Sequence, residues 1–65
     1  MDKAENLRNL IADNGLKLGF VAKKLGLSYS NFWLRLKGET KFNQDEIKIL
    51  VDLLKIPGDK IFNFF

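Results

Sequence analysis

Basic side chains are concentrated in the middle of this chain, where they could bind anionic groups. Residues 17–41 carry six basic side chains and one acidic side chain, which gives this stretch a charge of +5. Residues 1–16 and 42–65 each carry one more acid than base, so the net charge of the chain is +3. Such a patch is suited to phosphate groups, although a solvated lysine-rich face would give the same pattern. The six basic residues are Lys17, Lys23, Lys24, Arg35, Lys37 and Lys41.

Catalytic and metal-binding chemistry lacks suitable side chains. Ser28, Ser30 and Thr40 have no histidine to activate them, because the chain contains none. With histidine and cysteine both absent, an ordinary zinc site cannot be assembled. No apolar run is long enough for a membrane span. We therefore expect no enzymatic activity, no metal, no cofactor, no small-molecule ligand and no membrane partner.

Residues 16–38 predict two short helices joined by a tight turn. Gly26 interrupts the first helical pattern, because glycine adopts the left-handed backbone angles that close a helix C-terminus. Ser28 then has the side chain of a helix N-cap, and Gly38 ends the second helix. This unit, about residues 17–37, has the form of a helix-turn-helix, whose known use is to place its second helix in the DNA major groove.

Helical spacing divides the side chains of the second predicted helix, residues 28–37, into two faces. Phe32 and Leu36 are four residues apart and are expected to face inward. Hydroxyl and amide groups on the outer face could hydrogen-bond base edges, and its larger side chains could contact thymine methyl groups. The side chains expected on that outer face are Tyr29, Ser30, Asn31, Leu34 and Lys37.

Trp33 fits either face of this helix. Together with Tyr29, Phe32 and Leu36 it follows the spacing of a single apolar stripe, which would make it half-buried core. It could equally face outward beside Leu34. Leu34 itself is expected to stay outward, because any rotation that buries Phe32 and Leu36 turns it away from the core.

The residues of this unit resemble, in type and spacing, those of the phage repressor and Cro family of small DNA-binding domains, also called Xre-like. The resemblance covers about residues 5–62, including a helix around residues 7–8 before the unit and one around residues 45–47 after it. It implies an all-α fold, a compact five-helix repressor-like domain that comprises residues 1–65 as a single domain. The matching positions are Gly15-Leu16, Val21-Ala22, Leu25-Gly26-Leu27-Ser28, Phe32, Leu36 and Gly38.

The resemblance also implies a function and a place for it. The implied function is sequence-specific regulation of transcription by binding double-stranded DNA, and the implied place is the cytoplasm of a bacterium or a phage-infected cell. Asn31, on the expected outer face, completes the candidate DNA-binding set. Base reading is implied for Tyr29, Ser30, Leu34 and, as a further candidate, Trp33, and phosphate contact for Lys17, Lys37 and Lys41.

The chain departs from the family pattern at two places. Lys17-Leu18 stands where many relatives have Thr-Gln, so a side-chain cap is missing there. Trp33-Leu34 replaces a more usual polar pair, and an outer face this apolar could bind a protein. The second hypothesis is therefore an antirepressor-like protein-interaction module on the same fold. An arginine at the position of Arg8 commonly pairs with an acid in the family, which implies a structural role for it here.

Capping boxes predict the helices on either side of the unit. Asp2 with Glu5 begins the first helix, which ends at Asn14-Gly15. Asn43 with Glu46 begins the fourth helix. The apolar stripes that would face the core are Leu7, Leu10 and Ile11 in the first helix and Ile47, Leu50, Val51 and Leu54 in the fourth.

The C-terminal residues predict a short fifth helix and raise a question about aromatic side chains. Pro57 disfavours a continuation of the fourth helix, so the fifth is expected from 58 to about 64. The phenylalanines within residues 62–65 could complete the core. Alternatively, with Ile49 and Leu53 they could form an exposed patch through which two copies dimerise. A homodimer on a two-fold related operator is the expected assembly.

Overall fold

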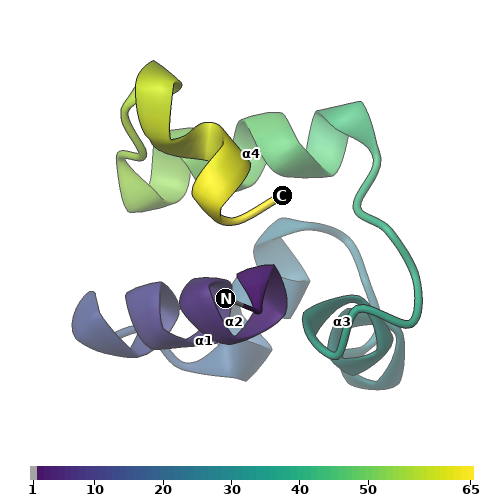
Figure 1. Ribbon diagram of the computed structural model, residues 1–65. Coiled ribbons are helices and arrows are strands. Elements are labelled where there is room, and N and C mark those ends of the chain that lie inside the picture. Colours follow the sequence, from purple (N-terminus) through teal and green to yellow (C-terminus); the bar gives the residue numbers. More distant parts are fainter. Residues whose placement is uncertain (1) are drawn as a thin grey trace.

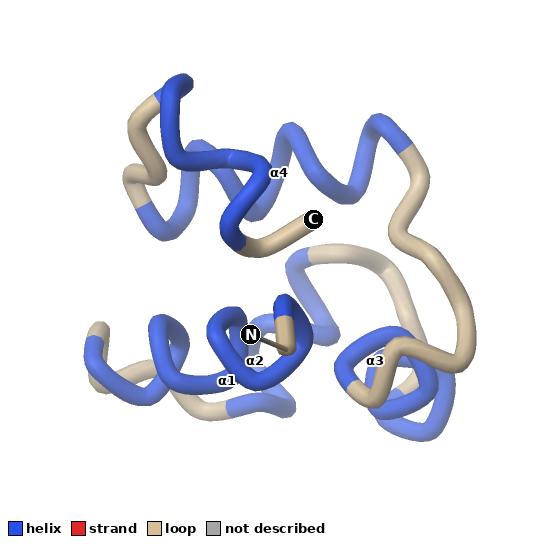
Figure 2. The backbone as a smooth tube through the Cα atoms, viewed as in Figure 1, coloured by secondary structure: helices blue, strands red, loops and turns tan. Residues whose placement is uncertain are grey.

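The computed structural model describes residues 2–65 and, within them, contains four α-helices, one 3-10 helix and no strand (Figures 1 and 2). This confirms the expected all-α fold with five helices. None of the helices between residues 2 and 65 is long and apolar enough to cross a membrane. The elements are α1 (Lys3–Asp13), α2 (Leu18–Lys24), α3 (Tyr29–Leu36), α4 (Gln44–Leu54) and the 3-10 helix η1 (Gly58–Asn63).

Local side-chain caps begin the first and fourth helices. The carboxylate of Asp2 accepts a hydrogen bond from the amide of Ala4 at 3.0 Å. The predicted capping box of Asp2 with Glu5 was wrong, because the Asp2 side chain accepts from the amide of Ala4, the second residue of α1, and not from that of Glu5. At the start of α4 the box is complete: Asn43 Oδ1 accepts from the Glu46 amide at 2.8 Å, and Glu46 Oε1 accepts from the Asn43 amide at 3.0 Å.

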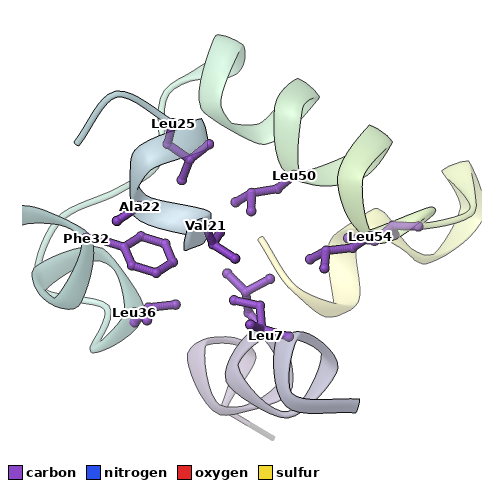
Figure 3. Packing of buried hydrophobic residues seen from close by; sticks show 10 residues of the cluster. Leu7, Val21, Ala22, Leu25, Phe32, Leu36, Leu50 and Leu54 are labelled. Carbon is purple, nitrogen blue, oxygen red and sulfur yellow. The ribbon is translucent and has the colours of Figure 1, made fainter. Parts of the chain in front are cut away.

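The core lies between the helices, with α4 and η1 on one side and α1, α2 and α3 on the other (Figure 1). Figure 3 shows Phe32 projecting from α3 toward Ala22 on α2, where the small alanine side chain lets the two helices approach. Phe32 and Leu36 are both 0% exposed, which confirms the inner face predicted for α3. The buried apolar side chains are Leu7, Ile11, Val21, Ala22, Leu25, Phe32, Leu36, Leu50, Leu54 and Ile56.

The C-terminal aromatic side chains are divided between core and surface. Phe64 and Phe65 are half-buried against the core, and the Phe65 ring meets the Phe42 ring edge-on with centroids 5.6 Å apart. Phe62, in contrast, is 79% exposed. Ile49 on α4 is 38% exposed, whereas Leu53 packs partly against the core. The core explanation therefore applies to Phe64, Phe65 and Leu53, whereas Phe62 and Ile49 are exposed and dimerisation through them stays a prediction.

Lys55 ends α4 in an unfavourable backbone conformation for a residue with a side chain. Its φ of 55° and ψ of 47° are left-handed, and its amide donates to the carbonyl of Val51. A Cβ in this conformation costs about 1–2 kcal/mol, and glycine avoids that cost at the expense of a more flexible unfolded chain.

Lys55→Gly is therefore expected to increase the free energy of unfolding by about 0.5–1 kcal/mol, measured by urea denaturation. Lys48→Gly, at an exposed position inside α4, serves as the control and should lower it by about 1 kcal/mol. If both variants lose the same stability, the left-handed end of α4 is not a source of strain.

Candidate nucleic-acid interface

The connection between α2 and α3, residues 25–28, fixes how the two helices meet. Gly26 has a φ of 71°, which explains why glycine follows Leu25, the C-cap residue of α2. The amide of Leu27 donates to the carbonyl of Ala22 at 3.0 Å. Ser28 Oγ then accepts from the Asn31 amide at 3.2 Å and caps α3. The turn and the N-cap predicted from the sequence are confirmed.

The other end of α3 is held by Arg8 from α1. Its Nη1 donates to the carbonyl of Leu36 at 2.6 Å, so a guanidinium meets the negative end of the helix. The expected structural role is confirmed, but its expected acidic partner was wrong, since no ion pair involving Arg8 forms among residues 2–65. The Leu36 carbonyl is at the end of α3, which packs against α1. Local sequence does not reveal that this carbonyl lies near Arg8.

A second arginine connects α3 to the start of α4. Arg35 Nε donates to Glu46 Oε1 at 2.9 Å, and Arg35 Nη1 donates to the carbonyl of Asn31 at 3.3 Å. Glu46 is only 6% exposed and also caps its own helix through Asn43. The helix that presents the candidate site is thus fixed by polar contacts to α1 and α4 as well as by its buried face.

The outer face of α3 is exposed as predicted. Tyr29 is 51% exposed and Leu34 is 36% exposed, and Ser30 and Asn31 are also at the surface. Within residues 2–65, the side chains of Ser30 and Asn31 form no hydrogen bond with the protein. Their polar groups are therefore open to an external partner, next to one aromatic and one aliphatic side chain.

Trp33 occupies the border of this face. It is half-buried and packs partly against the core, as the apolar-stripe interpretation predicts. Its ring stands edge-on to that of Tyr29, with centroids 6.2 Å apart and planes at 76°. The indole therefore supports Tyr29 from the side, and only its exposed part can reach a partner.

The lysines around α3 carry uncompensated charge. Lys17 is the N-cap residue of α2 and, among residues 2–65, no side-chain hydrogen bond caps that helix end, as the departure from Thr-Gln led us to expect. Lys37 is the C-cap residue of α3, and Lys41 lies in the loop before α4. In the part of the chain described, the one ion pair is Arg35 with Glu46, so these lysines have no acidic partner there.

No protein-family model, curated protein or solved structure matches this chain. Membership of the phage repressor and Cro family therefore stays a prediction from the residues quoted above.

Sequence reasoning missed two features of this region. Arg35 was counted only as part of the positive charge, although it forms an ion pair with Glu46. The capping box of Asn43 and Glu46 was the signal that the Glu46 carboxylate would be held in place. Sequence reasoning also overlooked Phe20 on α2, which is 45% exposed and has the ammonium group of Lys24 5.4 Å from its ring centroid. A cation over an aromatic face is attracted by the ring, by about 0.5–1 kcal/mol at an exposed site such as this one.

Proposed function

We propose that this chain is a small transcriptional regulator of phage repressor or Cro type that binds double-stranded DNA with α3 in the major groove. One observation carries the proposal: α3 buries Phe32 and Leu36 completely while its opposite face offers Ser30 and Asn31 without internal hydrogen bonds. Lysines without acidic partners lie at the start of α2, at the end of α3 and in the loop before α4. A rigid helix with open polar groups and surrounding positive charge suits base reading combined with phosphate contact.

The proposed contacts divide by chemistry. Ser30 and Asn31 would hydrogen-bond base edges, and Tyr29 and Leu34 would contact thymine methyl groups, with the exposed part of Trp33 beside them. Phosphate contact is assigned to Lys17, Lys37 and Lys41. In this arrangement the lysines supply affinity that falls with salt, and the residues of α3 supply discrimination between sequences.

A homodimer would match a two-fold related operator. The Cα trace of one protomer extends 29 × 22 × 21 Å, so two adjacent copies can place their α3 helices about 34 Å apart, which is one turn of DNA. Ile49 and Phe62 are exposed apolar side chains available for such a contact, and Leu53 lies one helical turn from Ile49. Binding at a promoter would block transcription there, in the cytoplasm of a bacterium or a phage-infected cell.

The experiment that tests DNA binding is fluorescence anisotropy with a labelled duplex at a series of salt concentrations. The double variant Lys37→Gln/Lys41→Gln is expected to bind any duplex about tenfold more weakly and to reduce the slope of log affinity against log salt by about 2. The matched control is Lys48→Gln/Lys60→Gln, which removes the same charge from exposed positions outside residues 17–41. Equal loss in both variants, or no binding at low salt, contradicts the proposal.

The second candidate function is a protein-interaction module on the same fold. It is favoured by the apolar exposure of Phe20, Tyr29 and Leu34, which are 45%, 51% and 36% exposed. Leu34→Asp separates the two functions, because a buried charge at an apolar protein interface costs far more than the loss of one methyl contact in a groove. A protein partner recovered by the wild type and lost with Leu34→Asp, together with undetectable DNA binding, would favour this candidate.

A further inference from the structure

A pocket of about 370 Å³, open to solvent, lies where the start of α1, the loop after α3 and the C-terminal residues meet. Figure 1 shows the C-terminal end of the chain between α1 and α4, and residues of both helices line the pocket. Its volume is within the range of small-molecule sites. Tyr29, Ser30 and Asn31 do not line it, so it is separate from the outer face of α3, although Lys41 belongs both to the pocket and to the proposed phosphate contacts.

The inner part of this pocket is apolar. Leu7 is 1% exposed, and Phe42 and Phe65 meet edge-on at 5.6 Å between ring centroids. Phe42 is in turn edge-on to the core residue Phe32, with centroids 6.4 Å apart. These rings are supported from behind, so the pocket offers a formed apolar surface against which an aliphatic or aromatic group can be buried.

The charged side chains that line the pocket all have the same sign. Lys3, Arg35 and Lys41 line it, and within residues 2–65 no acidic side chain does. Arg35 is held in position by Glu46 and by the carbonyl of Asn31, whereas Lys3 and Lys41 are exposed and have no acidic partner in the described chain. The basic side chains, rather than the amide of Ala4, would hold an anion, because Asp2 already accepts from that amide.

We propose that this pocket binds a small amphipathic carboxylate, with its apolar body against Phe42 and Phe65 and its carboxylate between Lys3 and Lys41. A neutral apolar molecule leaves the positive charge unused, a cation is repelled by it, and inorganic phosphate makes no use of the rings. The site goes beyond the proposed DNA function and does not depend on it.

Decanoate is a suitable probe, and ¹H–¹⁵N NMR titration of the intact chain below the micelle concentration is the test. Saturable shifts are expected for the amides of Lys3, Ala4, Phe42 and Phe65, at millimolar concentration or below. Decyltrimethylammonium, with the same chain and the opposite charge, should bind at least tenfold more weakly, and inorganic phosphate should give no saturable shifts there.

Lys3→Gln/Lys41→Gln is expected to weaken decanoate binding about tenfold, because both charges near the carboxylate are removed. Lys48→Gln/Lys60→Gln is the control of equal charge and should bind as the wild type does. Thermal unfolding of both variants establishes that they are folded. The proposal is overturned if decyltrimethylammonium binds as tightly as decanoate, or if the control variant loses as much decanoate affinity as Lys3→Gln/Lys41→Gln. It is also overturned if phosphate alone gives saturable shifts at the pocket, or if the decanoate shifts are spread over the whole chain.

Discussion

Phe32→Ala is expected to lower the free energy of unfolding by about 3–5 kcal/mol, the range for truncating a fully buried aromatic side chain. Phe32 is 0% exposed and lies at the meeting point of α2, α3 and the Phe42 ring (Figure 3). A chain of 65 residues has a total stability of only about 3–10 kcal/mol. The loss is therefore a large fraction of the total stability, and at the lower end of that range the variant is largely unfolded at room temperature.

Circular dichroism during urea denaturation measures this effect. Leu34→Ala is the control on the same helix, because Leu34 is 36% exposed on the opposite face and its truncation should cost about 1 kcal/mol or less. A smaller loss for Phe32→Ala than for Leu34→Ala would mean that α3 presents the other face to the core. The proposed DNA-contacting residues would then be on the wrong side of the helix.

Glu46→Ala is expected to lower the free energy of unfolding by about 2–3 kcal/mol. Among residues 2–65, Glu46 is the buried charged side chain, 6% exposed, and it accepts from both Arg35 Nε and the Asn43 amide. Its removal leaves two donors without an acceptor. Breaking a fully buried pair costs about 3–5 kcal/mol, and the figure here is lower because the Arg35 side chain is 20% exposed and can rehydrate.

Urea denaturation of Glu46→Ala should be compared with that of Asp45→Ala. Asp45 is the neighbouring acid in the first turn of α4, is exposed, and should contribute about 0.5 kcal/mol through the helix dipole. Glu46→Gln keeps one acceptor oxygen, so its loss in free energy of unfolding is expected to lie between those of Glu46→Ala and Asp45→Ala. If the two alanine variants lose the same stability, the ion pair does not hold α3 to α4.

Residue types and their spacing along the chain predict where α2 ends, where α3 and α4 begin, and which face of α3 is buried. Gly26 with its positive φ, the Ser28 cap and the capping box at Asn43 act within a few residues, so the local chain contains all the information they need. The spacing of Phe32 and Leu36 likewise indicates which face of the helix is buried, because helical geometry alone relates them.

Which distant groups meet depends on how the helices pack together. Arg8 donates to a carbonyl 28 positions away, Arg35 pairs with an acid on another helix, and Lys3 and Phe65 line the same pocket. The spacing of Trp33 fitted both the buried stripe and the outer face of α3. Its half-buried position depends on how α3 is rotated against the core. Helical spacing describes one helix at a time, whereas these contacts depend on the angle and distance at which several helices pack.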